Sequence, residues 1–283
     1  MKEDVTYLFV PANKKELFSK ALECGADAII IDLEDSVHPA EKTHGRENIV
    51  SWFAAVNGDS ITTKIYIRIN HPECVDFIND VKMLNSLVGA SITGIMVPKM
   101  ESGDTIDRIK NHLTDKLTEL PFIGIIETAR GVHCSYAIAT SGITRIAFGS
   151  LDYSLDINCQ QTSDAFLYAR SQIVVASRVA NLSAPIDCVT PDFFSSDTLS
   201  VDAQHAQSLG FGAKLCIHPK QVSIVAKVFS PSEEQKQWAN KVIEQSKDNY
   251  VFQVEGVMVD LPLIKQASRL LGKVTENLNK NNY

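Results

Sequence analysis

Residues 122–128 read Phe-Ile-Gly-Ile-Ile-Glu-Thr, an apolar run that ends in a carboxylate, and residues 145–152 repeat this arrangement as Arg-Ile-Ala-Phe-Gly-Ser-Leu-Asp. Each apolar run has the length of one strand, and the lack of polar alternation is typical of strands covered on both faces. The ends of consecutive strands are neighbours in a parallel barrel. We therefore expect Glu127 and Asp152 to share one hard cation. Oxygen ligands favour Mg²⁺, whereas either acid alone is equally well explained as a solvated or salt-bridged residue.

Short apolar runs of this kind recur along the chain and alternate with longer amphipathic segments. Residues 39–56 begin with a proline suited to a first helical turn, and residues 163–182 carry apolar side chains at steps of three or four. Eight such β-then-α units predict an α/β fold, a (β/α)8 TIM barrel. The expected strands are residues 6–10, 28–31, 64–69, 94–97, 122–126, 145–148, 184–188 and 213–217.

The chain is expected to have two parts, a catalytic barrel over residues 1–230 and a C-terminal helical extension over residues 231–283. In the extension, Ser230, Pro231 and Glu233 fit a helix start, with serine as the cap. This helix should run to about residue 246, before a strand or hairpin over residues 250–259 and a helix over residues 262–278. The extension is too small for a core of its own, so it should pack on the barrel or on a neighbouring subunit.

Composition excludes several classes of function. The 283 residues carry a net charge of −7, which does not suggest a nucleic-acid or anionic-membrane partner. No apolar stretch is long enough to span a bilayer, and no signal peptide precedes the first expected strand. The six cysteines form no CxxC pair, which indicates free thiols in a reducing, cytoplasmic compartment.

The second expected strand ends in an acidic segment. Asp32 and Glu34 point the same way if the backbone is extended there. They could hold metal-bound water at the rim of the barrel. Alternatively, they form structural salt bridges with Lys42, Arg46 or Lys99.

Three further side chains have both a catalytic and a structural interpretation. Arg68 ends the third strand and can clamp a substrate carboxylate, pair with the acids of the second strand, or do both. His218 is better explained as a packed residue at a strand-to-helix turn than as a base. Asp260 precedes Pro262 by two residues, which suits a helix N-cap, although a proton-transfer group on a mobile tail is the alternative.

Lys14 and Lys20 follow the first expected strand, near Phe9. Lysines beside an aromatic ring can receive the phosphates and adenine of a nucleotide-like ligand, but spacing alone favours surface lysines on an amphipathic helix. No GxGxxG or Walker A pattern is present, so a dinucleotide or ATP cradle is not indicated.

Taken together, several segments resemble the citrate lyase β-subunit-like family, whose members include malyl-CoA and citramalyl-CoA lyases. The resemblance runs in order from residue 6 to about residue 271. The segments that carry it are residues 8–11 (LFVP), 31–37 (IDLEDSV), 39–42 (PAEK), 68–70 (RIN), 97–99 (VPK), 126–131 (IETARG), 149–152 (GSLD) and 216–219 (CIHP).

The resemblance implies a Mg²⁺-dependent TIM barrel that cleaves a carbon–carbon bond in a 3-hydroxyacyl thioester, and a homo-oligomer, a trimer or hexamer. It implies that Asp260 lies on a C-terminal lid that reaches the site of a neighbouring subunit. The roles that it implies for the other residues are metal binding by Glu127 and Asp152, substrate-carboxylate binding by Arg68, and CoA binding by Phe9, Lys14 and Lys20. We also expect Glu127, Glu34 and Asp32 to take part in substrate binding.

The expected reaction is a retro-Claisen cleavage that yields a 2-oxo acid and a CoA thioester. The resemblance favours citramalyl-CoA, which gives pyruvate and acetyl-CoA, ahead of malyl-CoA, which gives glyoxylate. A citrate lyase β subunit that acts on the thioester of an acyl carrier protein is a second enzymatic hypothesis. A metabolite-binding protein that kept the fold without the chemistry is the hypothesis from another class.

Overall fold

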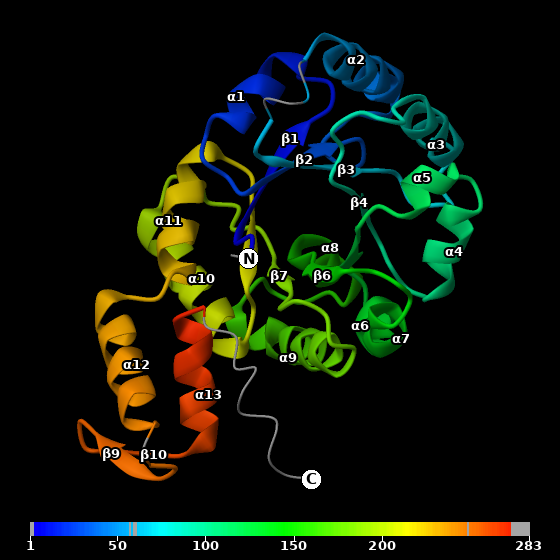
Figure 1. Cartoon of the computed structure of the whole chain (residues 1–283). Helices are drawn as coiled ribbons and strands as arrows, with labels where there is room; N and C mark the ends of the chain where they lie inside the picture. Colours follow the sequence, from blue (N-terminus) through cyan, green and yellow to red (C-terminus); the bar gives the residue numbers. More distant parts are fainter. Residues whose placement is uncertain (1–2, 57, 59–60, 248, 273–283) are drawn as a thin grey trace. The chain divides into compact units, whose positions relative to one another are not determined.

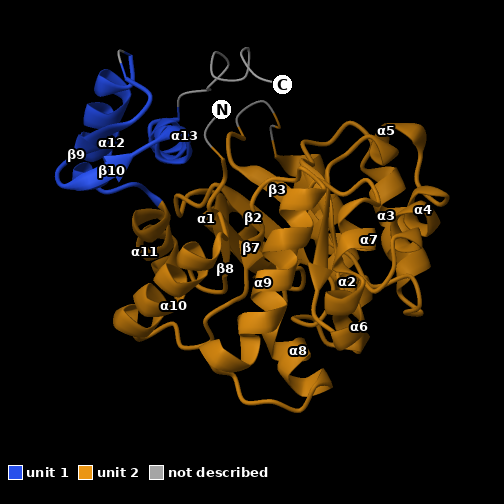
Figure 2. Ribbon diagram, turned by 90° about the horizontal axis from the view of Figure 1, so that it is seen from below, with its two compact units in different colours: residues 1–2, 230–283 blue, residues 3–229 orange. Residues whose placement is uncertain are grey.

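The computed structural model describes residues 3–56, 58, 61–247 and 249–272, and it divides the chain into two compact units (Figure 2). The larger unit spans Glu3–Phe229, and the other begins at Ser230. We describe each unit by itself.

The larger unit is built on a closed barrel of eight parallel strands that follow one another in chain order (Figure 1). The predicted TIM barrel is therefore confirmed. The strand expected over residues 184–188 is reduced to a two-residue β7, so its predicted length was wrong. The strands are β1 (Thr6–Pro11), β2 (Ala28–Asp32), β3 (Lys64–Arg68), β4 (Gly94–Val97), β5 (Phe122–Ile126), β6 (Arg145–Phe148), β7 (Ile186–Asp187) and β8 (Ala213–Cys216).

Helices surround the barrel, as Figure 1 shows. The segment expected over residues 39–56 begins as a 3-10 turn before α2, and the segment expected over residues 163–182 ends three residues early. The helices are η1 (Lys15–Leu17), α1 (Phe18–Leu22), η2 (Pro39–Glu41), α2 (Lys42–Ala55), α3 (Phe77–Ser86), α4 (Asp104–Lys110), α5 (Asp115–Thr118), α6 (Ala129–His133), α7 (Ser135–Ala139), α8 (Ser150–Asp156), α9 (Ser163–Val179), α10 (Ser196–Leu209) and α11 (Pro219–Phe229).

The strands are largely apolar because their two faces pack into different cores. In β2, Ile29 and Ile31 join the large cluster between the strands and the helices. Ala28 and Ile30 face the other way and join the cluster that fills the barrel. Successive side chains of a strand point to opposite faces, so most positions of such a strand are apolar until the strand reaches the rim.

The second unit pairs two helices with a short antiparallel hairpin, in the order α12 (Glu233–Gln245), β9 (Phe252–Val254), β10 (Val257–Val259) and α13 (Leu261–Leu270). It contains a small apolar cluster that includes Val242, Val259 and Ile264, so the expectation that it lacks a core was wrong. The last helix was expected to reach residue 278, and residues 273–278 of that prediction lie outside the described residues.

Helix α12 begins two residues later than expected. The Ser232 hydroxyl accepts a hydrogen bond from the Gln235 amide, and the Gln235 side chain accepts one from the Ser232 amide. This reciprocal pair is a capping box. The cap is therefore Ser232 rather than Ser230, because the residue three positions after Ser232 completes the box.

Within the part of the chain that the structure describes, no helix combines the length and the apolar character that crossing a bilayer requires.

Candidate active site

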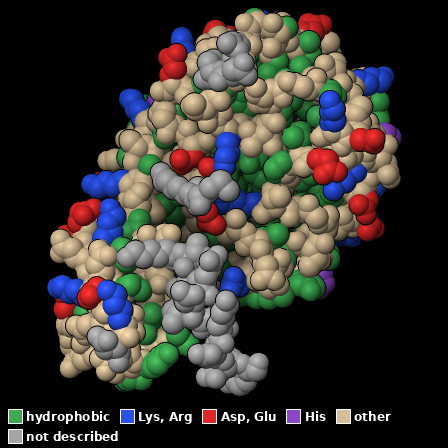
Figure 3. All heavy atoms as spheres, in the orientation of Figure 1, with side chains coloured by type: hydrophobic (Ala, Val, Ile, Leu, Met, Phe, Trp, Pro, Cys, Tyr) green, Lys and Arg blue, Asp and Glu red, His purple; other side chains and the backbone are tan. Residues whose placement is uncertain are grey.

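A cavity of about 190 Å³ lies at the carboxyl ends of the barrel strands. This is the end of the barrel where TIM-barrel enzymes place their active sites. On the face shown in Figure 3, basic and acidic side chains are interspersed. The charged residues that line the cavity are Asp32, Asp35, Arg68, Glu127 and Asp152, and its apolar lining includes Phe9, Phe148 and Leu215.

Asp32 and Arg68 are held together by the register of the barrel. They are partners at the ends of β2 and β3, and the guanidinium donates from Nε to Asp32 Oδ1 at 2.6 Å and from Nη2 to Oδ2 at 2.7 Å. Burial alone would raise the pKa of Asp32, but the charge and hydrogen bonds of Arg68 outweigh it and lower that pKa. Asp32 also accepts the Glu34 and Ser36 amides, so it fixes both the arginine and the acidic loop.

Arg68 retains donors for a ligand. Its Nη1 lies 3.0 Å from Glu34 Oε2, so the expected pairing with both acids of the second strand is present. A guanidinium carries five N–H groups, and these three contacts engage about three of them. The remaining two belong to the terminal nitrogens, and Arg68 lines the cavity. The Phe9 ring lies 4.7 Å from the guanidinium carbon, which adds a cation–π contact.

Glu127 follows β5 and is fixed by its neighbours. The Lys99 amide donates to its Oε1 at 2.7 Å. On the other side, the Gly149 amide continues the β5–β6 ladder by donating to Ile126, which brings Gly149 against the glutamate. A Cβ at position 149 would lie 2.6 Å from the Glu127 Cβ, so only glycine fits there. Burial, followed by the neighbouring charges of Glu34 and Asp152, raises the pKa of Glu127 to about 8 despite the opposing effect of Arg68.

Asp152 does not stand at a strand end, and that prediction was wrong. It lies in the first turn of α8, beyond Gly149, because the chain turns into a helix directly after β6. The prediction that matters for the chemistry is its nearness to Glu127, and both acids line the same cavity. The Asp152 side chain is 33% exposed, so its oxygens are open to a ligand.

Lys99 joins these acids, although the sequence indicated it only as an ion-pair partner. Its Nζ contacts Glu34 Oε1 and lies 3.4 Å from Asp35 Oδ2 and 3.5 Å from Asp152 Oδ2. Burial disfavours the ammonium, but the hydrogen bond to Glu34 and the surrounding carboxylates outweigh this cost and raise the pKa of Lys99. The signals in the sequence were its place after β4 at the rim and its part in the segment 97–99 (VPK).

The other two cations suggested as partners of the rim acids bind elsewhere. Lys42 donates to Asn70 Oδ1. Arg46 pairs with Asp76 and Asp80 at 3.1 and 2.9 Å. The salt-bridge interpretation therefore holds for Lys99 and is wrong for Lys42 and Arg46.

The residues suggested for CoA are spread apart. Phe9 lines the cavity beneath Arg68. Lys14 precedes η1 and Lys20 lies on α1, and both are exposed and do not line the cavity. A role of the two lysines in binding CoA stays a prediction.

His218 makes the local contacts of a packed turn residue. Its ring stacks on Phe193 with centroids 4.9 Å apart, and its Nδ1 accepts a hydrogen bond from the Lys220 amide. It does not line the cavity. These contacts support the structural interpretation.

Asp260 belongs to the second unit and occupies the N-cap position of α13. Its side chain makes no capping hydrogen bond, although Pro262 stands in the first turn as expected. The carboxylate is therefore not committed to the helix end, and a role in proton transfer stays a prediction.

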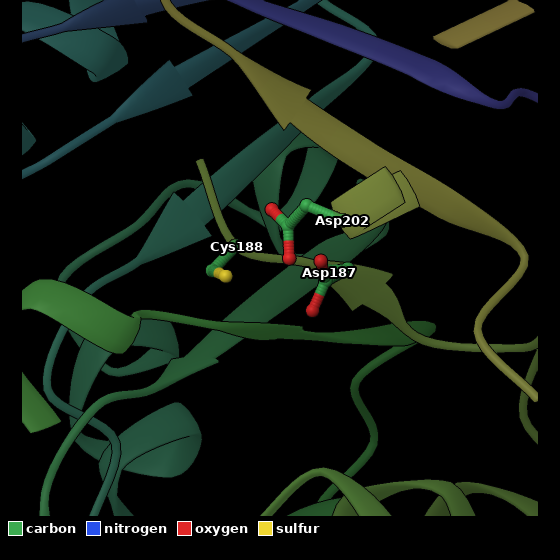
Figure 4. Close-up of side chains that lie close together, drawn as sticks. All are labelled: Asp187, Cys188 and Asp202. Atoms are coloured by element: carbon green, nitrogen blue, oxygen red, sulfur yellow. The ribbon is translucent and has the colours of Figure 1, made fainter. Parts of the chain in front are cut away.

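A second acidic group lies near β7, where Asp187, Cys188 and Asp202 approach one another (Figure 4). Their potential ligand atoms lie within 4.8 Å of each other. However, Lys214 Nζ lies 2.7 Å from a carboxylate oxygen of each aspartate, and Arg170 pairs with both. Two cations already compensate two carboxylates, so this group closes the barrel rather than forming a metal site.

An eight-stranded parallel barrel with a charged cavity at the carboxyl ends of its strands defines the class of TIM-barrel enzymes. Residues 6–219 match the family described as HpcH/HpaI aldolase/citrate lyase, and the chain belongs to this family. The predicted family, and with it the lyase class, is thereby confirmed.

Two relatives and one solved structure illustrate the match. The citrate lyase subunit beta-like protein of Mycobacterium tuberculosis is 30% identical over 95% of this chain and 95% of the relative. The mitochondrial citramalyl-CoA lyase of Homo sapiens is 30% identical over 95% of this chain and 84% of that protein. The solved structure is of protein CitE from Mycobacterium tuberculosis in complex with magnesium, acetoacetate and coenzyme A. It has a TM-score of 0.81 and 29% identity, and covers 95% of this chain and 97% of its own.

Proposed function

We propose that the protein is a Mg²⁺-dependent carbon–carbon lyase that cleaves a 3-hydroxyacyl-CoA thioester, with citramalyl-CoA as substrate and pyruvate and acetyl-CoA as products. The observation that carries the proposal is one cavity that brings together Glu127, Asp152 and Arg68. Relatives that act on citramalyl-CoA or bind magnesium, an oxo acid and coenzyme A support it.

The donor set of the cavity fits magnesium. Glu127 and Asp152 offer carboxylate oxygens without a nearby imidazole or thiolate, and the open cavity leaves room for water and substrate oxygens. When bound there, Mg²⁺ would stabilise the alkoxide of the 3-hydroxyl group. Asp32 and Glu34 keep Arg68 in place while its two remaining N–H groups hold the substrate carboxylate.

The bond changes balance as follows. The 3-hydroxyl group loses its proton to water in the open cavity, its oxygen forms the carbonyl of pyruvate, and the carbon–carbon bond breaks toward the thioester. The electron pair of that bond becomes the enolate of acetyl-CoA. Asp260 donates a proton to this enolate, and it would abstract that proton in the condensation direction.

The extension supplies Asp260 as a lid. We propose that residues 231–283 close over the barrel site of a neighbouring copy in a homotrimer or hexamer, and that residues 1–230 form the catalytic domain. Phe9, Lys14 and Lys20 lie on the first strand and the segment that follows it, where they are proposed to receive the CoA moiety.

The direct test is product formation. Purified protein with Mg²⁺ and citramalyl-CoA should release pyruvate, which lactate dehydrogenase reports as NADH consumption, and EDTA should stop the release. Malyl-CoA, assayed for glyoxylate, tests the alternative substrate. Failure to form product from any 3-hydroxyacyl-CoA at saturating Mg²⁺ would overturn the proposal.

A citrate lyase β subunit is the second candidate, because a relative carries the name citrate lyase subunit beta-like protein. Activity of the isolated chain on free CoA thioesters favours the first candidate. Activity only on a citryl thioester of an acyl carrier protein favours the second. Oxo-acid binding that does not depend on Mg²⁺, without turnover, would favour a metabolite-binding protein.

A further inference from the structure

The Lys99 side chain lies among the acids of the proposed metal site. Its ammonium contacts Glu34 and lies within 3.5 Å of both Asp35 and Asp152. No other Lys or Arg in the described ranges forms a salt bridge with Asp152. The Lys99 ammonium is therefore the counter-cation of Asp152, which is proposed to bind magnesium.

The backbone of Lys99 has an unusual conformation that serves the same site. Its φ is 50°, in the left-handed region that side chains other than glycine and asparagine seldom adopt. In this conformation the amide donates to Glu127 Oε1 at 2.7 Å. One residue thus orients the first proposed metal ligand through its backbone and neutralises the second through its side chain.

We propose that the Lys99 ammonium takes the place of the divalent cation beside Asp152 when no metal is bound. When the metal binds, this ammonium must leave Asp152. The inference rests on the proposed function, because it requires that Glu127 and Asp152 bind Mg²⁺. The metal therefore competes at Asp152 with the Lys99 ammonium, a cation that the protein itself supplies.

Electrostatics makes the two cations mutually exclusive at Asp152. Two like charges about 4 Å apart repel each other strongly, and a divalent ion repels the ammonium about twice as strongly as a monovalent ion would. The Lys99 side chain is 38% exposed, so its ammonium can move into solvent without rearrangement of the barrel.

Mn²⁺ binding to charge-matched variants tests the competition, with free Mn²⁺ measured by electron paramagnetic resonance. Lys99→Met should bind Mn²⁺ on the order of tenfold tighter than the wild type, because the competing charge is gone. Lys99→Arg keeps the charge and should bind as the wild type does. Lys116→Met is the control, because it removes the same charge from an exposed lysine of α5. Unchanged or weaker binding by Lys99→Met would overturn the inference.

A second measurement uses the wild-type protein and does not depend on the folding of a variant. Lysines are acetylated briefly with acetic anhydride with and without Mg²⁺, and peptide mass spectrometry reports each site. Lys99 should react several-fold faster with Mg²⁺, since its ammonium is released from the carboxylates, while Lys116 should not change. Equal or slower acetylation of Lys99 with Mg²⁺ contradicts the inference.

Two further variants separate this inference from the proposed function. Glu127→Gln and Asp152→Asn should each weaken Mn²⁺ binding on the order of a hundredfold. If they do so but Lys99→Met does not tighten binding, the role of Lys99 fails and the metal site stands. If neither variant weakens binding, the proposed metal site itself fails.

Discussion

At the scale of single residues, the geometry of the candidate site requires glycine, which has no side chain, at position 149. Gly149 lies against Glu127, and a Cβ there would be 2.6 Å from the Glu127 Cβ. The backbone at Gly149, with φ of −105°, is one that any residue can adopt, so only the close approach requires glycine.

Gly149→Ala should therefore displace Glu127 without unfolding the barrel. We expect Mg²⁺ affinity to fall on the order of tenfold or more, because a carboxylate moved by about 1 Å no longer meets the geometry that Mg²⁺ demands. Isothermal titration calorimetry measures the affinity, and circular dichroism checks the fold. An unchanged affinity with an unchanged fold would show that Glu127 does not bind the metal.

Residues at strand ends were the part of the site that the sequence predicts best. The pairing of Arg68 with the acids of the second strand follows from the parallel register, which makes Asp32 and Arg68 partners. The central place of Lys99 could not be predicted, because it depends on a left-handed backbone and on a long side chain. That side chain reaches from the end of β4 to Glu34, which follows β2.

At the scale of elements, the barrel is weakest at β7 and is reinforced there by side chains. β7 has two residues, and its register with β6 comprises a single pair, Ala147 and Ile186. Lys214 on β8 is fully buried and contacts Asp187 and Asp202, each at 2.7 Å. Buried ion pairs thus join β7 and β8 to α10 where the backbone ladder is short.

Lys214→Met should be strongly destabilising. It leaves Arg170 as the one remaining cation for the carboxylates of Asp187 and Asp202, and removing one partner of a buried ion pair costs about 3–5 kcal/mol in comparable cases. The double variant Asp187→Asn with Lys214→Met restores the charge balance and should recover part of this loss. Urea unfolding measures the free energies, and equal stability of the single variant and the wild type would contradict the role of the network.

The same network predicts acid sensitivity. Burial alone would raise the pKa of Asp202, but Lys214 and the hydrogen bonds around it lower that pKa below the ordinary value of 3.8. The pair therefore stabilises the fold above about pH 4, and this contribution is lost as the pH falls through the lowered pKa. Urea unfolding between about pH 6 and pH 2.5 should show a smaller loss of stability for Asp202→Asn than for the wild type. If the unfolding free energies of the two proteins fall in parallel with pH, Asp202 is not the source of the acid sensitivity.

Element types were predictable because the period of the apolar pattern distinguishes strands from helices. The residues at which elements begin and end were less predictable. β7 was expected to be longer because residues 184–188 are mostly apolar, but buried side chains replace its backbone pairing. Asp152 was placed at a strand end, although the chain already turns into α8 after Gly149.

At the scale of the whole molecule, we propose that the barrel and the extension serve one reaction. The alternation of strands and helices was sufficient to predict the barrel. How the proposed lid meets a site could not be predicted from pattern, because a contact between distant parts of a protein has no period along the sequence. The assignment of Asp260 to that lid therefore rests on family resemblance and on a carboxylate that makes no capping hydrogen bond.

Asp260→Asn should retain Mg²⁺ and pyruvate binding, while turnover should fall by a factor of roughly 10² or more. This factor is the usual contribution of a general acid. If the lid is shared between copies, mixing this variant with inactive Arg68→Met should restore part of the activity, because some sites then combine an intact barrel with an intact lid. Unchanged turnover of Asp260→Asn would remove the residue from the mechanism, and no recovery on mixing would place the lid over its own barrel.

The central claim is that Glu127 and Asp152 together bind one divalent ion. The most direct test is a crystal structure with Mn²⁺ in place of Mg²⁺, in which anomalous scattering locates the metal independently of any assumption about the site. We expect one strong peak with oxygen ligands from both acids, and with Lys99 withdrawn from Asp152. A peak at Asp187 and Asp202 instead, or saturating Mn²⁺ with no peak between Glu127 and Asp152, would contradict it.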